Sequence, residues 1–244
     1  MAKNIGIITP GGDSSGINAC IRAIVRNAIY YRLKVFGVYN GYQGLIEGDI
    51  QPLNARSVSG IINHGGTMLK STRCEQIKTR KGIGRAVKQL TNNKIDCLVI
   101  IGGDGSLRAG AELSKKGISV IGIPASIDND IYGTDETIGF DTAMDVAVEA
   151  IDKIRDTATS FNRVFLVEIM GREHGFLALA VGLASGAEYI LIPEIKYDLN
   201  KICDELNEAK EKGKTSEIII FAEGAGNILE VTKSELSHFL GDVF

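Results

Sequence analysis

The stretch CLVIIGGDGS, residues 97–106, joins a strand pattern to a loop of unusual chemistry. Five apolar residues run directly into three glycines, one carboxylate and one hydroxyl. An almost entirely apolar strand indicates burial on both faces, which is typical of parallel sheets covered by helices. Glycines alone would explain a turn, so the carboxylate of Asp104 requires a separate explanation.

Apolar runs of the same kind alternate with helix-like segments along the rest of the chain. Further strand-like runs occupy residues 4–9, 34–39, 118–124, 163–169, 189–193 and 217–223. Helix-like segments occupy residues 15–32, 84–93, 141–160, 174–185, 199–212 and 233–240. The alternation predicts an α/β protein with two Rossmann-like lobes, each built on a mostly parallel sheet covered by helices. We expect a larger lobe at residues 1–138 and a second lobe at residues 139–244.

Length and composition argue against several classes of protein. A formal net charge of −3 and 44% hydrophobic side chains over 244 residues indicate a soluble globular chain rather than a nucleic-acid binder. No run approaches the roughly 18 consecutive apolar residues of a membrane span, and we expect no cleavable signal. The four cysteines lack a C-x-x-C pair, so reduced thiols and a cytoplasmic location are expected. The three histidines are too dispersed in sequence to suggest a zinc site.

Four polar, glycine-rich junctions follow strands, at residues 9–16, 101–106, 123–130 and 168–175. Ligands of parallel α/β sheets bind beyond the carboxyl ends of the strands. Because all four junctions stand at such ends, we expect them to project toward one crevice. Their side chains are therefore the first candidates for a binding or catalytic site.

The first junction, TPGGDSSG, favours a phosphate ligand. Gly11, Gly12 and Gly16 let backbone amides face outward just before a helix, where the helix dipole attracts anions. The alternative is a tight turn with Asp13 as a cap. The spacing fits neither the dinucleotide fingerprint nor a P-loop, because the one Gly-Lys-Thr has Glu208 at the first P-loop glycine position.

The second junction suggests a metal. Gly103 and Gly105 leave room for a polyanion against the backbone, and Asp104 would repel its phosphates unless a cation lay between them. Mg²⁺ held by one carboxylate and phosphate oxygens meets that need. Ser106 can donate a hydrogen bond from the first helical turn. Alternatively, Asp104 simply caps the helix that follows.

The third junction, ASIDND, carries two carboxylates two residues apart. On an extended backbone, Asp128 and Asp130 would face the same side. Close carboxylates divide their roles, so Asp128 is a candidate to accept a proton from a substrate hydroxyl. The alternative is a pair of turn carboxylates that bind local amides.

Three arginines stand near the junctions and suit bidentate phosphate binding: Arg73, Arg163 and Arg172. Arg172 is the best placed, since it lies within a glycine loop after a strand. The alternative for each is an ordinary solvated side chain. A nucleotide–Mg²⁺ site, a carboxylate base and arginines for a second phosphorylated ligand together predict phosphoryl transfer.

At these residues the sequence closely resembles the bacterial-type ATP-dependent 6-phosphofructokinase family, from Lys3 to about Glu223. The motifs occur in order as GGD..G.N..IR, GY.GL, GGT.L..(T/S)R, IGGDGS, IP.(S/T)IDND, GTD.TIGFDTA, EIMGR..G and F..AEG. The resemblance implies transfer of the ATP γ-phosphoryl group to the 1-hydroxyl of fructose 6-phosphate, with Mg²⁺, in glycolysis. It also implies a nucleotide-binding first lobe and a sugar-phosphate-binding second lobe.

Matching positions imply residue roles. The implied nucleotide side comprises Gly12, Arg73, Cys74, Gly103, Asp104, Gly105 and Ser106, with Asp104 as metal ligand. The implied sugar-phosphate contacts are Ser126, Ile127, Asp128, Arg163, Met170, Gly171, Arg172 and Glu223. Catalytic roles are implied for Asp128 as the base, Arg172 and Gly12. Arg163 resembles an arginine lent by a neighbouring subunit, which implies a homotetramer with shared active sites.

Two small residues indicate which compound donates the phosphoryl group. Pyrophosphate-using relatives typically carry Asp in place of Gly105 and Lys in place of Ala125. Either side chain would fill the space that adenosine needs, so Gly105 and Ala125 favour ATP. Two positions near them depart from the family pattern, since Ser126 replaces Thr and Cys74 stands where an aromatic residue is common.

The family's site for an effector, ADP or phosphoenolpyruvate, is matched in part. The matching residues are Arg22, Arg26, Arg155, Glu188 and Lys212. Ala55 stands where Arg is usual and Gly60 where Asp is usual, so an effector phosphate would lose one set of donors.

Family chains continue well beyond Phe244, through a GH.QRGG.P-type motif that binds the sugar phosphate. We therefore expect an incomplete second lobe, and the alternative function is a non-catalytic relative that binds nucleotide or assembles without turnover. Two further alternatives are weaker. The SIDND and EIMGR segments weigh against a different GGDG kinase such as an NAD kinase, and the missing fingerprint weighs against an oxidoreductase.

Overall fold

The computed structural model describes residues 3–227 and 230–231 of the chain, which divide into two compact units. The first unit comprises the residues up to Ser126 together with Asp130–Gly139. The second unit comprises Ile127–Asn129 and the residues from Phe140 onward. This grouping places Ile127–Asn129, which we expected in the first lobe, with the second unit. The helix expected at residues 233–240 lies outside the described residues.

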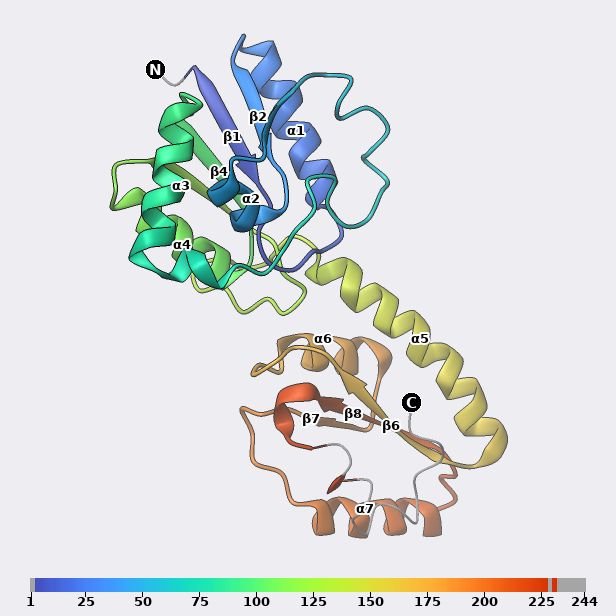
Figure 1. Cartoon of the computed structure of the whole chain (residues 1–244). Coiled ribbons are helices and arrows are strands. Elements are labelled where there is room, and N and C mark those ends of the chain that lie inside the picture. The colour runs from blue at the N-terminus through green and yellow to red at the C-terminus, as the bar shows by residue number, and fades with distance from the viewer. Residues whose placement is uncertain (1–2, 228–229, 232–244) are drawn as a thin grey trace. The chain divides into compact units, whose positions relative to one another are not determined.

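The first unit is built on a five-stranded sheet in the order β3-β2-β1-β4-β5 (Figure 1). All neighbouring strands are parallel except β2 and β3, which pair antiparallel. The strands are β1 (Asn4–Ile8), β2 (Lys34–Val38), β3 (Ile50–Leu53), β4 (Cys97–Gly102) and β5 (Ser119–Pro124). The helices are α1 (Ile17–Tyr30), α2 (Gly41–Glu47), η1 (Glu75–Lys78), α3 (Arg80–Asn92) and α4 (Asp104–Ser114).

Helices cover both faces of the sheet at β4, and this strand is apolar for that reason, whereas the edge strand β5 is largely exposed. Along β4, Leu98 and Ile100 pack into one buried cluster with side chains of α2 and α3. The alternate residues Val99 and Ile101 pack into a second cluster with α1. Successive side chains of a strand point to opposite faces, so a strand that is buried twice reads as a continuous apolar run.

The second unit holds a three-stranded parallel sheet in the order β6-β8-β7 (Figure 1). Helices α5 and α6 contribute to the apolar cluster on one face, and α7 contributes to the cluster on the other. The strands are β6 (Val164–Ile169), β7 (Tyr189–Leu191) and β8 (Glu217–Ala222). The helices are α5 (Phe140–Phe161), α6 (Phe176–Ser185), α7 (Leu199–Glu211) and η2 (Glu223–Ala225).

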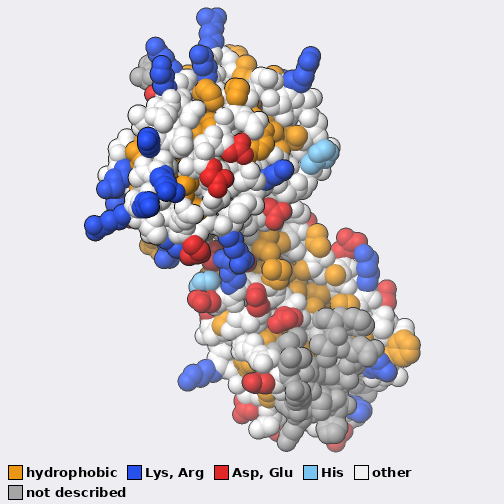
Figure 2. Space-filling model, viewed as in Figure 1, with side chains coloured by type: hydrophobic (Ala, Val, Ile, Leu, Met, Phe, Trp, Pro, Cys, Tyr) orange, Lys and Arg blue, Asp and Glu red, His pale blue; other side chains and the backbone are white. Residues whose placement is uncertain are grey.

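The predicted α/β architecture, with mostly parallel sheets covered by helices, is confirmed. No helix within the described ranges is long and apolar enough to cross a membrane. Many Lys and Arg side chains project from the first unit on the face that Figure 2 shows, and apolar side chains reach the surface of the second unit there.

Candidate active site

The first two polar junctions and the start of the third, up to Ser126, lie together at the carboxyl edge of the first sheet. The Ser106 hydroxyl, after β4, donates to the Pro10 carbonyl oxygen after β1 at 2.7 Å. The Ala125 amide, after β5, donates to the Gly102 carbonyl oxygen at 3.1 Å. The expectation that these loops meet is therefore correct for the first unit. The fourth junction belongs to the second unit.

The glycines of these loops are of two kinds. A Cβ added to Gly11 would lie 2.9 Å from Ser106 Oγ, and one added to Gly102 would lie 2.8 Å from the Pro10 carbonyl oxygen. These two glycines permit close packing between loops. A Cβ at Gly12 or Gly105, in contrast, would meet no described atom within 4 Å. Backbone is open there to an approaching ligand.

Asp104 is the first residue of α4, and the N-cap residue is Gly103. The alternative that Asp104 caps this helix is therefore wrong. Its carboxylate pairs with Arg108 Nε at 2.8 Å, and its side chain is 43% exposed. An accessible carboxylate in the first turn of a helix suits a hard cation such as Mg²⁺.

Ser106 differs from its neighbours because it is buried, at 7% exposure. Its hydroxyl donates to the Pro10 carbonyl oxygen, and its own carbonyl oxygen accepts a hydrogen bond from the Tyr42 hydroxyl at 2.7 Å. Ser106 therefore joins the β1 and β4 loops. Its predicted contact with nucleotide stays a prediction.

The segment with Arg73 and Cys74 runs past the first glycine loop. The Ser71 hydroxyl donates to the Gly11 carbonyl oxygen, which ties the two segments together. Arg73 is exposed, while the Cys74 thiol donates to Gln43 Oε1 at 3.4 Å. The predicted nucleotide residues of the first unit thus occupy one neighbourhood of the sheet edge.

The second unit brings Asp128 and Arg172 together. Arg172 Nε lies 3.4 Å from Asp128 Oδ2, and Asp128 is only 5% exposed. Asn129 has a left-handed φ of 51°, so the backbone is not extended between Asp128 and Asp130. The expectation that these two carboxylates share one side by strand alternation is therefore wrong, because alternation requires an extended chain.

Other predicted sugar-phosphate residues gather around Arg172. Glu223 Oε2 accepts hydrogen bonds from the amides of Gly171 at 3.3 Å and Arg172 at 3.0 Å. Met170, which directly precedes Gly171, is 63% exposed, so its side chain does not pack into the core of this unit. Ile127 belongs to the same unit as this group, whereas Ser126 belongs to the first unit.

Arg163 lies apart from this group within its own unit. Arg163 directly precedes β6, and Met170 directly follows β6. The six residues of β6 span roughly 20 Å at about 3.3 Å per residue. The Arg163 guanidinium carbon stands 5.5 Å from the centre of the Phe161 ring. Arg163 and Arg172 are therefore separated by the length of a strand.

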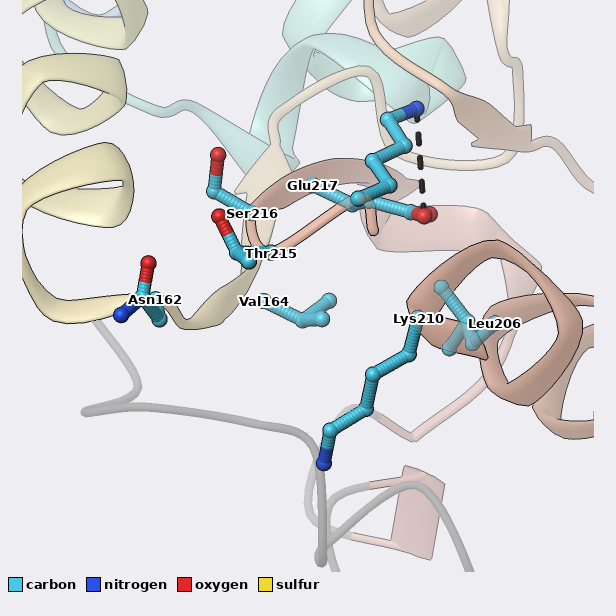
Figure 3. Close-up of a pocket in the computed structure, with 8 residues that line it drawn as sticks. Asn162, Val164, Leu206, Lys210, Thr215, Ser216 and Glu217 are labelled. Atoms are coloured by element: carbon cyan, nitrogen blue, oxygen red, sulfur yellow. Dashed lines mark ion pairs between the residues drawn. The ribbon is translucent and has the colours of Figure 1, made fainter. Parts of the chain in front are cut away.

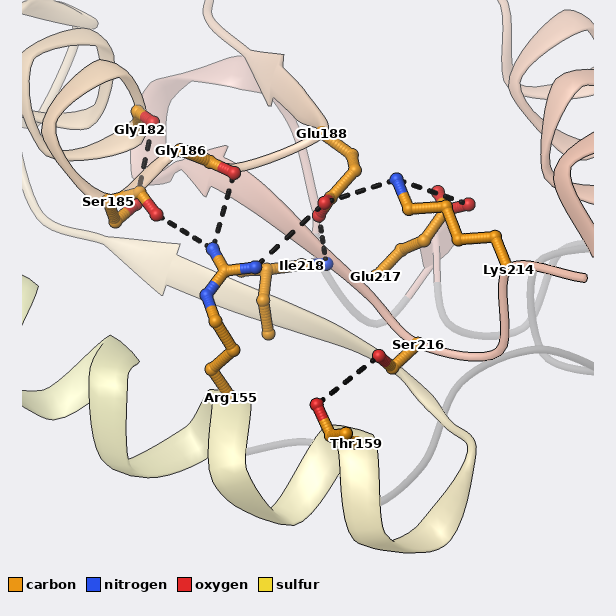
Figure 4. A network of polar contacts seen from close by, with 10 residues as sticks. All are labelled: Arg155, Thr159, Gly182, Ser185, Gly186, Glu188, Lys214, Ser216, Glu217 and Ile218. Atoms are coloured by element: carbon orange, nitrogen blue, oxygen red, sulfur yellow. Dashed lines mark hydrogen bonds and ion pairs between the residues drawn. The ribbon is translucent and has the colours of Figure 1, made fainter.

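Two of the predicted effector residues meet in a polar network of the second unit (Figure 4). Arg155 Nη1 lies 3.9 Å from Glu188 Oε1, and Arg155 Nη2 donates to the Ser185 carbonyl oxygen at 2.8 Å. Glu188 also accepts a hydrogen bond from the Ile218 amide at 2.7 Å. This network fixes the start of β8 against the end of α6.

Lys214, not Lys212, is the lysine of this network. Lys214 Nζ lies 3.2 Å from Glu188 Oε1, whereas Lys212 Nζ pairs with Glu208 Oε2 at 3.4 Å. In the sequence, Lys214 belongs to the Gly-Lys-Thr that does not match a P-loop. This tripeptide was the one sequence feature that could have drawn attention to Lys214. Arg22 and Arg26 lie on α1 of the first unit, where Arg22 Nη1 donates to the Val58 carbonyl oxygen at 3.0 Å.

A shallow hollow of about 320 Å³ adjoins this network (Figure 3). Lys214 borders both features and pairs with Glu217, whose carboxyl pKa is raised by burial. The lining residues of the hollow are Asn162, Val164, Leu206, Lys210, Lys214, Thr215, Ser216 and Glu217.

Parallel sheets with glycine loops at the carboxyl edge, and a buried carboxylate beside an arginine, are typical of α/β enzymes that act on phosphorylated ligands. The Phosphofructokinase family model matches residues 4–243. The chain therefore belongs to the phosphofructokinase family.

Curated bacterial proteins match along most of the chain. The ATP-dependent 6-phosphofructokinase of Oceanobacillus iheyensis is 52% identical over 231 residues, which cover 95% of this chain and 72% of that protein. The ATP-dependent 6-phosphofructokinase of Clostridioides difficile matches with the same identity and coverage. Among solved structures, the T-state phosphofructokinase of Pichia pastoris superposes with a TM-score of 0.92 at 35% identity, covering 100% of this chain and 29% of that one.

Proposed function

We propose that the chain transfers the γ-phosphoryl group of Mg-ATP to the 1-hydroxyl of fructose 6-phosphate, which gives fructose 1,6-bisphosphate and ADP in glycolysis. The observation that carries this proposal is the buried Asp128 carboxylate beside Arg172, in a chain that shares 52% identity with bacterial 6-phosphofructokinases. A carboxylate base and a fixed cation are the two groups that such a transfer asks of the protein.

The first unit supplies the nucleotide side of the proposal. Open backbone at Gly12 and Gly105 offers amides to phosphate oxygens, and Arg73 adds a cation in the same neighbourhood. The absence of a side chain at Gly105 and the small Ala125 also favour ATP over pyrophosphate, since adenosine needs that space.

Asp104 fits Mg²⁺ as a single protein ligand. Among the described residues, no cluster of three or more His, Cys, Asp or Glu side chains could hold a metal. Mg²⁺ commonly binds one carboxylate and completes its shell with substrate phosphates and water. When bound, the ion would neutralise negative charge on the phosphates.

The second unit supplies the acceptor side. Asp128 takes the proton from the 1-hydroxyl of the sugar, which makes the oxygen a better nucleophile. Arg172 places positive charge where negative charge develops on the transferred group. Met170, Gly171 and Glu223 surround this pair and border the sugar-phosphate site.

We further propose a homotetramer with active sites shared between copies. Arg163 lies a strand length from Arg172 in its own chain, which supports a role in a neighbouring copy. Phe176, Leu179 and Leu183 form an exposed apolar stripe at helical spacing on α6, which supports burial against a second chain. We place an effector phosphate near Arg155 and Lys214.

We also propose a cytoplasmic location. The four cysteines all lie in the described residues and form no disulfide with one another. Thiols of this kind are typical of proteins in reducing compartments.

An assay that couples fructose 1,6-bisphosphate formation to a dye tests the proposal. We expect turnover with ATP in the unmodified chain. Asp128→Asn should lower kcat at least about 1,000-fold because the proton acceptor is removed. Nucleotide binding without turnover in the unmodified chain would favour the non-catalytic alternative. Phosphorylation of NAD instead of the sugar phosphate would overturn the substrate assignment.

A further inference from the structure

Two carboxylates from outside the β6–α6 loop, residues 170–175, hold its backbone. Glu223, directly after β8, accepts hydrogen bonds from two successive amides, those of Gly171 and Arg172. Glu194, after β7, accepts a hydrogen bond from the Gly175 amide at 2.9 Å. The loop is thus held near both ends by acidic side chains of the segments that follow β8 and β7.

Arg172 needs such support because its backbone is left-handed, with a φ of 52°. A residue with a Cβ is disfavoured in that region, and such conformations persist where surrounding contacts hold them. Successive amides that point at one anion form a stable concave arrangement. The Glu223 carboxylate is the anion that these two amides bind, so it stabilises the backbone conformation that orients the Arg172 side chain.

Close backbone packing at the same place leaves the loop little room to relax. A Cβ added to Gly224 would lie 2.3 Å from the Arg172 carbonyl oxygen. A Cβ added to Gly171 would lie 2.5 Å from the His174 carbonyl oxygen, and the Gly171 carbonyl oxygen accepts a hydrogen bond from the His174 amide at 3.0 Å, which closes a tight turn. Glu223 and Gly224 are consecutive, so one short segment both packs against and binds the loop.

We propose that Glu223 and Glu194 are positioning residues that hold the loop so that the Arg172 guanidinium reaches Asp128. For Glu223 this role is additional to the direct sugar contact that the family resemblance implies. Glu194 has no role in that resemblance. The effect on turnover rests on the proposed function, whereas the effect on the loop does not.

The first experiment measures amide hydrogen exchange in the full chain without ligands. Loss of a hydrogen bond to a charged acceptor should speed exchange about tenfold, at Gly171 and Arg172 in Glu223→Ala and at Gly175 in Glu194→Ala. Glu223→Gln keeps one acceptor oxygen and should restore part of the protection. The matched control is Glu173→Ala, which removes an exposed carboxylate from the same loop and should leave all three amides unchanged.

Circular dichroism confirms that each variant is folded before exchange is read. Unchanged exchange at Gly171 and Arg172 in folded Glu223→Ala would overturn the inference for Glu223. The same result at Gly175 would overturn it for Glu194.

The second experiment is a double-mutant cycle with Arg172→Ala. If Glu223 acts through Arg172, Glu223→Ala lowers kcat about three- to tenfold in the native background and has little further effect in Arg172→Ala. A sugar contact that does not act through Arg172 predicts instead that the two losses multiply and that the KM for fructose 6-phosphate rises. If the unmodified chain shows no turnover, the proposed function fails, while the exchange experiment still decides how the loop is held.

Discussion

Gly11 and Gly12 are adjacent in the chain, but glycine is required at the two positions for different physical reasons. Gly11 has a φ of 94°, and an added Cβ would lie 2.9 Å from Ser106 Oγ. Gly12 has room for a side chain in the protein as it stands. One glycine is therefore required by the fold, and the other is a candidate requirement of the ligand.

Alanine substitutions separate these two requirements. Gly11→Ala should lower the free energy of unfolding by about 1–2 kcal/mol, because a Cβ is disfavoured at positive φ. Gly12→Ala should change it by less than about 0.5 kcal/mol, while weakening Mg-ATP binding. Urea denaturation measures the first effect and isothermal titration calorimetry the second. Equal stability of Gly11→Ala and the native chain would contradict this division.

Several residue roles could not be read from the sequence, for specific reasons. Ser106 looks like a ligand contact, but only the structure shows that its hydroxyl reaches the Pro10 carbonyl oxygen, 96 residues away. Lys214 and Lys212 are both plausible partners of Glu188, and the turn before β8 selects Lys214. The pairing of Asp128 with Arg172 joins distant segments, although each residue was recognisable by its position after a strand.

At the scale of secondary structure, helix α3 begins with a side-chain cap. Thr79 Oγ1 accepts a hydrogen bond from the Gly82 amide at 3.0 Å. Thr79→Ala should lower the free energy of unfolding by about 1 kcal/mol, because a first-turn amide loses its partner. Thr79→Ser keeps the hydroxyl and should cost much less. Chemical denaturation of the three proteins checks this, and equal losses in both variants would show that the cap is not the cause.

The start of β1 and the start of β4 are joined by one carboxylate, which makes stability depend on pH. Asp96 Oδ2 accepts hydrogen bonds from the amides of Lys3 at 2.7 Å and Asn4 at 3.0 Å. These bonds hold the pKa of the Asp96 carboxyl below its usual value. The stabilisation is fully present above the unfolded-state pKa, about 3.9, and is lost as the pH falls through the folded-state pKa.

Melting temperatures of the native chain and Asp96→Asn should therefore differ at pH 7, begin to converge below about pH 4, and meet only once the pH has fallen through the lowered pKa of folded Asp96. The expected order is native above variant at pH 7. A gap that stays constant from pH 7 to the acid limit would mean that ionisation of Asp96 does not matter.

The strands were predictable because burial on both faces leaves a continuous apolar run, as in β4 and β8. The short elements α2 and β3 were not predicted. β3 is an antiparallel edge strand that contains Pro52, which removes one donor and breaks the usual strand signal. α2 begins after Asn40, whose backbone is left-handed, and this conformation could not be predicted from the sequence.

At the scale of the whole molecule, the proposed sharing of active sites between copies predicts complementation between inactive chains. Arg163→Ala and Asp128→Asn should each be inactive alone. Unfolded together in equal amounts and refolded, they should recover about a quarter of native turnover, because random assembly pairs an intact Arg163 with an intact Asp128 at that frequency. Light scattering checks that tetramers form. No recovery from well-formed mixed tetramers would show that each chain uses its own Arg163.

The strand order β6-β8-β7 has a consequence for synthesis on the ribosome. β6 and β7 each pair with β8 and are made before it, so neither has its sheet partner when it emerges. At about 5–20 residues per second, several seconds pass between the end of β6 and the arrival of β8. For that interval the nascent chain carries two apolar strands without their partner, and β8 then enters the sheet between them.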